Sequence, residues 1–347
     1  MEQLTIREIA KLCGVGVSTV SRAINNHPDI NPETKQMILD TVRQYNYVPN
    51  NSARNLKRTD SNTVAVLVKG VSNPFFAVMI RMLEQDIIGR QYLFVLQQVE
   101  EEENELEVAL QLTKEKRLKG IVFLGGAIRH DERLLRQLSV PYVFSTVNAE
   151  LPEDGGEEMR GAAVAIDDEA ESFRMTEYLI GCGHRRIAIL TAFAEDASIG
   201  RLRLDGYRRA LETHGIAYDE SLVIHMDRSL RTYTMGSGYR AASALLDSGR
   251  DFSCIYAISD TLAVGACKAV FDRGRRVPGD ISVAGFDGLD IARYYEPSLT
   301  TVEQPAEEMA RETIRALFAL INGTPTAGKY IFEARIREGA SVRRIAQ

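Results

Sequence analysis

A short run near the N-terminus of this sequence carries side chains suited to contacting nucleic acid. Val17, Ser18, Ser21 and Arg22 fall on one face of a helix at their spacing. A serine hydroxyl bonds to a phosphate or a base edge, and an arginine guanidinium forks onto guanine. This pattern predicts a helix face that binds DNA. It also fits a small three-helix bundle whose polar residues face only water.

Local signals predict the helices that would position this face. Thr5 and Glu8 form a capping box at the start of a first helix. Gly14-Val15-Gly16 interrupts the helical pattern, which resumes from Ser18 to Asn25. A third helix begins at Pro32, because proline suits the first turn. Two short helices separated by a tight turn predict a helix-turn-helix, whose second helix enters the major groove.

Composition places the chain among soluble, multi-domain proteins. Its 347 residues exceed what one core usually holds. Residues 1–60 carry 8 basic and 6 acidic side chains, so a mildly basic start precedes an acidic remainder in a chain of net charge −6. No run is long and apolar enough for a membrane span, and the N-terminus lacks the apolar segment of a secretory signal. Four scattered cysteines predict reduced thiols and a cytoplasmic protein.

The pattern after residue 60 changes to alternating strands and helices. Such alternation predicts parallel sheets covered by helices, and about 280 residues of it are too many for one open sheet. We therefore expect two Rossmann-like lobes, with the chain crossing between them in the acidic, glycine-rich stretch 151–161. Ligands bind at the carboxyl ends of strands in such sheets, which would face the cleft. The strand-like runs are 64–68, 93–96, 121–124, 142–145, 163–166, 187–190, 222–225, 255–257 and 281–285.

A series of short motifs across almost the whole chain is similar to the lactose/galactose repressor (LacI/GalR) family. In the first 60 residues the motifs are Thr5–Ala10, Gly14-Val15, Ser18–Asn25, Tyr47–Asn50, Ala53-Arg54 and Leu56. In the remainder they are Ser72–Phe76, Gly183-His184, Arg203, Gly206-Tyr207, Ser259-Asp260, Gly285–Asp287 and Thr300–Pro305. Their order and spacing make the resemblance specific.

This resemblance implies a homodimeric transcription repressor that binds a pseudo-palindromic double-stranded operator. It implies a helix-turn-helix headpiece over 1–48, a hinge helix over 49–60, and a two-lobed effector-binding and dimerisation core over 61–347, as in periplasmic sugar-binding proteins. Leu56 would be the wedge that opens a central base step in the minor groove. The implied DNA contacts are Thr5, Val17, Ser18, Thr19, Ser21, Arg22, Asn25, Asn50, Ala53, Arg54 and Leu56.

The resemblance also implies a small sugar-like effector between the lobes. Arg203 and Asp287 would bind its hydroxyl groups, and one of Phe75 and Phe76 would face the cleft. Where many relatives carry an aspartate after the strand at 142–145, this chain has Ser145-Thr146, so a hydroxyl replaces a carboxylate. The implied effector contacts are Asn73, Phe75, Phe76, Thr146, Arg203, Ser259, Asp260, Asp287 and Gln304.

Other functions fit the sequence less well. Gly323–Lys329 matches a phosphate-binding loop up to its lysine, but Tyr330 stands where such a loop has the serine or threonine that binds Mg²⁺. Cys182 and His184 are too isolated to predict a zinc site. We expect no enzyme activity, cofactor or metal. A sugar-binding receptor without a direct DNA role is the alternative, and the helix-turn-helix argues against it.

Overall fold

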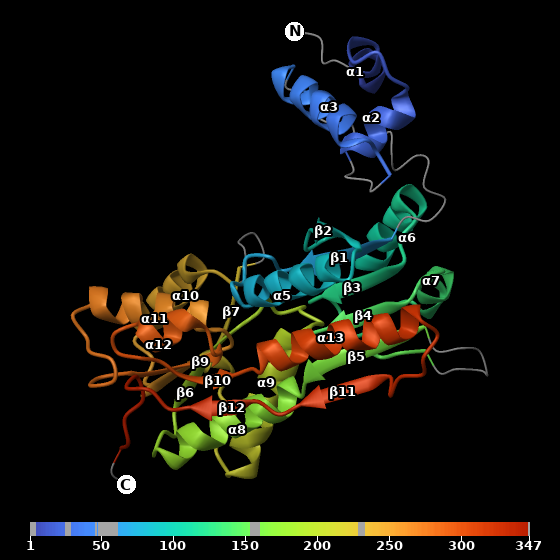
Figure 1. Ribbon diagram of the computed structural model, residues 1–347. Helices are drawn as coiled ribbons and strands as arrows, with labels where there is room; N and C mark the ends of the chain where they lie inside the picture. The colour runs from blue at the N-terminus through green and yellow to red at the C-terminus, as the bar shows by residue number, and fades with distance from the viewer. Residues whose placement is uncertain are drawn as a thin grey trace. The chain divides into compact units, whose positions relative to one another are not determined.

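The computed structural model describes residues 5–24, 29–45, 47, 62–152, 160–227 and 233–345. The chain divides into two compact units, Met1–Ser61 and Asn62–Gln347, called here the headpiece and the body (Figure 1).

The headpiece is helical. It contains α1 (Ile6–Leu12), α2 (Val17–Ile24) and α3 (Pro32–Gln44). Both bonds of the predicted capping box are present between Thr5 and Glu8, and Asn31 caps α3. Ile9, Val20 and Ile38, one from each helix, are fully buried against one another. The helices α1 and α2 and the turn between them form the predicted helix-turn-helix.

The body contains, within its described residues, two six-stranded sheets that define lobe 1 and lobe 2. The first has the order β11-β5-β4-β3-β1-β2 and the second β12-β10-β9-β8-β6-β7. Their strand pairs are parallel except β10 with β12. The strands are β1 (Thr63–Lys69), β2 (Leu93–Val99), β3 (Gly120–Leu124), β4 (Tyr142–Ser145), β5 (Gly161–Ile166), β6 (Ile187–Thr191), β7 (Val223–His225), β8 (Cys254–Ala257), β9 (Ser282–Asp287), β10 (Thr300–Glu303), β11 (Lys329–Phe332) and β12 (Arg335–Arg337).

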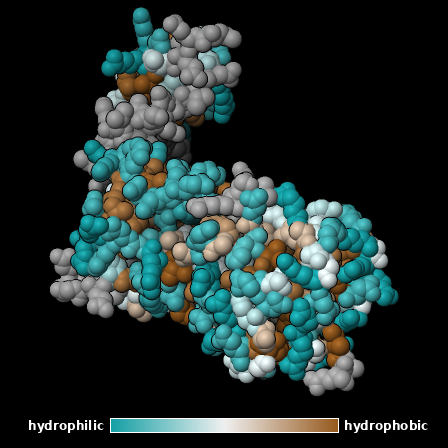
Figure 2. All heavy atoms as spheres, turned by 180° about the vertical axis from the view of Figure 1, so that it is seen from behind, coloured by the Kyte–Doolittle hydropathy of each residue, from teal (hydrophilic) through white to brown (hydrophobic). Residues whose placement is uncertain are grey.

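Helices cover the sheets of both lobes (Figure 1). In lobe 1 they are α5 (Phe75–Gly89), α6 (Glu105–Lys116), α7 (Glu132–Gln137) and α13 (Ala306–Ile321), and in lobe 2 they are α8 (Asp168–Gly181), α9 (Ile199–Thr213), α10 (Met235–Asp247), α11 (Asp260–Asp272) and α12 (Asp290–Tyr294), with a 3₁₀ turn at Glu220–Leu222. No helix of the described residues has the length and apolar character to cross a membrane. The body surface in Figure 2 is mostly hydrophilic, with separate apolar patches.

The described chain passes between the two sheets at three places. These are the segments after β5, after β10 and between β11 and β12. The predicted crossing at 151–161 is wrong, because β5 pairs with β4 in lobe 1. The described residues before and after this stretch belong to neighbouring strands of one sheet. Glycine and acidic composition alone does not distinguish a connection within one sheet from a crossing to another. The first crossing instead follows Ile166.

Close approach of α8 and α9 depends on a glycine. A Cβ at Gly206 would overlap the carbonyl oxygen of Glu169 and lie 2.9 Å from the amide nitrogen of Phe173. Both atoms belong to the backbone of α8, so they move only if the whole helix shifts. Gly206 therefore sets the distance between these two helices, which carry parts of the site described below.

We predict that Gly206→Ala destabilises the protein by about 1–3 kcal/mol, as other overpacked interiors do. The measurement is urea unfolding of the full chain. Gly89→Ala is the matched control, because it also lies in a helix and its Cβ would meet no described atom within 4 Å. The control should be neutral or slightly stabilising. Equal stability of the two variants would contradict the role given to Gly206.

Candidate functional site

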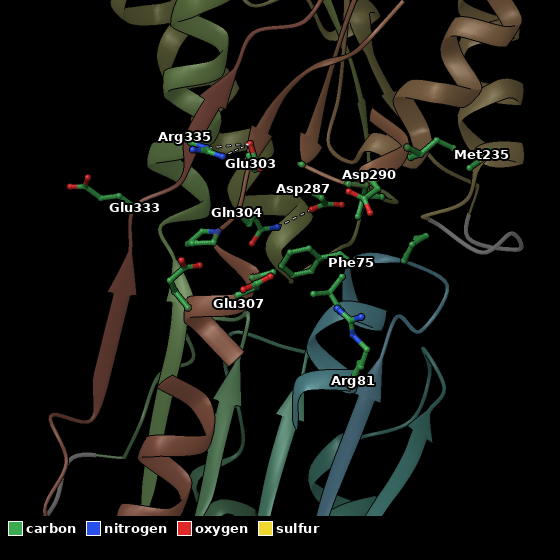
Figure 3. A pocket seen from close by; sticks show the side chains of 18 residues that line it. Phe75, Arg81, Met235, Asp287, Asp290, Glu303, Gln304, Glu307, Glu333 and Arg335 are labelled. Carbon is green, nitrogen blue, oxygen red and sulfur yellow. Dashed lines mark hydrogen bonds and ion pairs between the residues drawn. The ribbon is translucent and has the colours of Figure 1, made fainter. Parts of the chain in front are cut away.

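Asp287, at the end of β9, accepts hydrogen bonds from both sides of the body. The side-chain amide of Asn73 in lobe 1 donates to its Oδ2 (3.0 Å), and that of Gln304, in the crossing after β10, donates to its Oδ1 (2.9 Å). Figure 3 shows the second of these bonds. The carboxylate is 1% exposed, so these bonds form away from water. Asp287 therefore connects lobe 1, lobe 2 and one crossing.

Arg203 of α9 is the cation of the site and is 1% exposed. Its Nε donates to Asp168 (2.9 Å), and one terminal nitrogen donates to the carbonyl of Ile258 (2.6 Å). The same nitrogen lies 3.5 Å from Asp287, and the guanidinium stacks 3.6 Å from the ring centre of Phe286. The structure thus brings the predicted pair of Arg203 and Asp287 together.

The centre of the site has an excess of carboxyl groups. Burial raises the pKa of Asp168 to about 6, although the charge of Arg203 opposes it. Burial also raises the pKa of Asp287, against the same cation. For Asp260, burial and then the charge of Asp287 raise the pKa to about 8. A further negative charge would be unfavourable here, so the site suits a neutral ligand with hydroxyl groups better than an anion.

A cavity of about 770 Å³ opens beside this network, between the lobes. Of the predicted effector residues, it is lined by Phe75, Asp287 and Gln304. Figure 3 shows Phe75 and Gln304 near Asp287, with Arg81 of α5 on the side of lobe 1. Such a volume fits a small organic molecule. The lining joins an aromatic ring to amide and carboxylate groups, a combination suited to a sugar.

Phe75 and Phe76 begin α5 and differ in their surroundings. Asn73 positions them, because its Oδ1 accepts from the amide nitrogen of Phe75 (3.1 Å). The two rings meet edge to face at 6.0 Å. A Cβ at Gly125 would lie 3.0 Å from the ring of Phe76, so Phe76 packs over the end of β3. Phe75 instead lines the cavity.

Backbone strain marks two predicted residues. Four described residues other than glycine have positive φ, and two of them, Gln91 and Arg117, lie just after helices. The other two are Thr146 (φ 71°) and Asp287 (φ 113°). Strain of this kind persists where the surroundings enforce it, and it concentrates at functional sites. The hydroxyl of Thr146 also accepts from the amide of Gly125 (3.2 Å), next to Phe76.

Ser259 and Asp260 hold α11 in place. Ser259 caps that helix by accepting from the amide of Leu262 (3.3 Å). Asp260 accepts from the hydroxyl of Thr301 (2.6 Å) and from the amide of Leu289 (2.7 Å). Both side chains are fully buried, and neither lines the cavity. The same holds for Asn73, Phe76, Thr146 and Arg203, which are buried and absent from the cavity lining.

Three residues absent from the sequence prediction lie close enough to Arg203 to interact with its charge: Asp168, Asp196 and Tyr233. Asp168 pairs with Arg203. Within the part of the chain that the structure describes, Oδ2 of Asp196 and the hydroxyl of Tyr233 are buried without a hydrogen-bond partner. A Cβ at Gly200 would lie 2.5 Å from the first and 3.4 Å from the second, so both atoms are near one point. Asp168 and Asp196 follow strands β5 and β6, and a search for carboxylates after every strand would have found them.

The residues of α2 that the sequence predicted to contact DNA differ in their exposure. Val17 is 41% exposed, and Ser18 and Arg22 are exposed while Thr19 and Ser21 are partly buried. Arg22 lies 3.3 Å from Asp29, and Thr5 serves as the cap of α1. The remaining predicted contacts lie outside the described residues: Asn25, Asn50, Ala53, Arg54 and Leu56.

Known protein families match both the headpiece and the body. Residues 5–50 match the family of bacterial regulatory proteins of the lacI type, and residues 176–342 match a periplasmic binding protein-like domain. The chain is 39% identical over 322 residues to the HTH-type transcriptional regulator MalR of Clostridium butyricum, covering 92% of this chain and 93% of that protein.

Two further similarities cover nearly the whole chain. HTH-type transcriptional regulator CelR of Thermobifida fusca is 34% identical and shares 93% of each chain. A solved complex of transcriptional regulator CelR with cellobiose is 32% identical, with a TM-score of 0.68 and coverage of 98% of this chain and 100% of that chain. These relatives are regulators of transcription and not enzymes. The protein is therefore a DNA-binding transcriptional regulator and belongs to the LacI family.

Proposed function

We propose that this regulator is a repressor whose affinity for operator DNA is switched by a small sugar-like effector bound between the lobes of the body. The observation that carries the proposal is the hydrogen bond between Asn73 of lobe 1 and Asp287 of lobe 2 (3.0 Å). A ligand that contacts Asp287 changes the balance between closed and open lobes. Such a ligand acts by binding one arrangement more tightly than the other.

The chemistry of the cleft supports a sugar. Asp287 accepts hydrogen bonds and Gln304 both donates and accepts them, while Phe75 offers an aromatic face for C–H groups. The relative solved with cellobiose supports the same class of ligand. We propose that Asp196 and Tyr233 add an acceptor and a hydroxyl to this set. The proposed contacts from lobe 1 and the network are Asn73, Phe75, Phe76, Thr146, Arg203, Asp287 and Gln304, while Ser259 and Asp260 position α11.

For the DNA-binding part we propose the boundaries 1–48 for the headpiece, 49–60 for a hinge helix and 61–347 for the core. In the headpiece α2 enters the major groove with Ser18 and Arg22 toward the bases. Leu56 of the hinge wedges into the minor groove. Because its target is genomic DNA, we place the protein in the bacterial cytoplasm.

We further propose that the protein is a homodimer through one edge of lobe 1. Strand β2 is the edge of its sheet. The side chains there include three exposed apolar residues, Ile88 (54%), Leu93 (52%) and Leu96 (47%). An exposed apolar strand edge invites pairing with another chain. A second copy of this edge would cover the patch and bring two headpieces to one pseudo-palindrome.

Replacing Arg22 tests the DNA contact. We expect Arg22→Ala to weaken binding by about 1–3 kcal/mol and to relax base preference at one position in each half-site. The measurement is fluorescence anisotropy on operators selected by the wild-type protein from random DNA, at one fixed salt concentration. Arg43→Ala is the control, because Arg43 is an exposed arginine on α3 that also lies beside an aspartate. Even weakening on all sequences would make Arg22 a phosphate contact.

Replacing Asp287 tests the effector site. Asparagine keeps the shape and tolerates positive φ, but it loses one acceptor for the ligand and for Arg203. We expect Asp287→Asn to bind operator normally and to need at least about tenfold more effector for switching, since an unpaired hydroxyl costs about 1–3 kcal/mol. Paired anisotropy titrations with the effective sugar measure this. Asp280→Asn, an exposed aspartate of lobe 2, should switch like wild type. An unchanged midpoint in Asp287→Asn would place the site elsewhere.

Replacing Leu96 tests the dimer. A charge introduced in the apolar patch should separate the two copies, so Leu96→Glu should sediment as a monomer at concentrations where the wild type is a dimer. Analytical ultracentrifugation distinguishes the two masses. Gln137→Glu introduces the same charge at an exposed position of α7, away from β2, and should remain dimeric. A dimeric Leu96→Glu protein would show that the interface lies on another face.

A further inference from the structure

An acidic side chain lies beside the arginine of α2 that we propose for base contact. Nη1 of Arg22 lies 3.3 Å from Oδ2 of Asp29, and the two side chains are 56% and 50% exposed. Asp29 belongs to the turn before α3, the helix that Asn31 caps. An ion pair this exposed contributes little to the stability of a protein. Stability of the headpiece therefore gives no reason for a carboxylate at this place.

Arg22 contacts Asp29 with only part of its guanidinium. A guanidinium has five N–H donors in one plane, and a contact with the O6 and N7 atoms of guanine needs two of them. The contact with Asp29 is made by Nη1, and the edge formed by Nη2 and Nε carries two parallel donors suited to guanine. A side chain that is already restrained loses less conformational freedom on binding. The pairing therefore restrains Arg22 without using the edge that reads a base.

The negative charge of Asp29 acts against contacts with the DNA backbone. Phosphates attract arginine on any sequence, and this attraction supplies nearly all non-specific binding. A carboxylate beside Arg22 competes with a phosphate for the same guanidinium and repels the phosphate itself. It does not repel guanine in the same way, because the base is neutral. Asp29 therefore disfavours the sequence-independent contact more than the sequence-specific one, which increases specificity.

We propose that Asp29 is a positioning residue for Arg22 and raises the preference of the regulator for guanine at the base pair that Arg22 contacts. The inference rests on the proposed function of α2 as the helix that enters the major groove. Asp29 itself contacts no base in this arrangement. It acts by restraining Nη1 of Arg22 and by repelling the phosphates that compete for the guanidinium.

The experiment measures binding of the full-length protein to three duplexes by fluorescence anisotropy at one fixed salt concentration. The first is an operator selected by the wild-type protein from random DNA. The second is the same operator with the base pair read by Arg22 changed in both half-sites, and this base pair is the one at which Arg22→Ala loses its preference. The third is a random sequence of the same length. The affinity ratio of the first two duplexes is called here the operator preference.

Removal of the charge tests the positioning role. We expect Asp29→Asn to lower the operator preference about fivefold and to bind the random duplex about threefold more tightly. Asp29→Glu restores the carboxylate and should restore most of the preference. Asp40→Asn is the matched control, because Asp40 is an exposed aspartate of α3 that pairs with Arg43 (3.7 Å). This control should keep the wild-type preference.

A double variant shows whether Asp29 acts through Arg22. In the Arg22→Ala background, Asp29→Asn should cause no further loss of operator preference, because no guanidinium is left to position. Binding to the random duplex shows that the headpiece of each variant is folded. A purely structural role of Asp29 would weaken binding to all three duplexes and would leave their ratios unchanged.

Four results would overturn the positioning role. They are a wild-type preference in Asp29→Asn, an equal loss in Asp40→Asn, an equal loss in Asp29→Glu, and an undiminished effect of Asp29→Asn in the Arg22→Ala background. If Arg22→Ala keeps full base preference at every position, the proposed base contact of Arg22 is wrong, and the positioning role with it. The first four results leave that contact standing, so the two failures are distinguishable.

Discussion

Burial of the Arg203 guanidinium imposes the arrangement around it. A charge removed from water costs several kcal/mol unless carboxylates and hydrogen-bond acceptors match it. Asp168 supplies one carboxylate just after the first crossing, and Asp287 supplies another at the end of β9. Because Asp168 lies just after the first crossing and Asp287 lies inside lobe 2, the pairing of both with Arg203 connects that crossing to the interior of lobe 2. The pairing of Arg203 with these two carboxylates therefore joins the start of α8 to the end of β9.

The bonds of Arg203 and the bond between Asn73 and Asp287 differ in which parts of the body they connect. Arg203 is held within lobe 2 by bonds to Asp168 and Ile258. By contrast, one bond joins Asn73 to Asp287 across the lobes. Asp287 has positive φ, and its partners hold the backbone in that conformation. In the proposed switch, a ligand at Asp287 would alter its contact with Asn73 of lobe 1 and leave the bonds of Arg203 to Asp168 and Ile258 formed.

The cleft surface of lobe 1 is built differently from that of lobe 2. It lines the cavity with the ring of Phe75 and with Arg81, both from α5. Lobe 2 offers Asp287, which pairs with Arg203, and Asp290 and Glu303. A sugar matches this asymmetry, because its C–H faces pack on the rings of one lobe while its hydroxyl groups bond to the charges of the other.

Interactions between residues that are close in sequence determined the helices of the headpiece and the alternating elements of the body. The capping box of Thr5, the break at Gly14 and the alternation of strands and helices follow from interactions within a few residues, so the headpiece and two lobes were predictable. Family resemblance added Arg203 and Asp287. Only the tertiary structure decided that β5 belongs to lobe 1, that Asp260 bonds to Thr301 and Leu289, and that Asp196 and Tyr233 both lie beside Gly200. Asn73 and Asp287 are 214 residues apart, and no local pattern encodes a contact that depends on how the chain crosses between sheets.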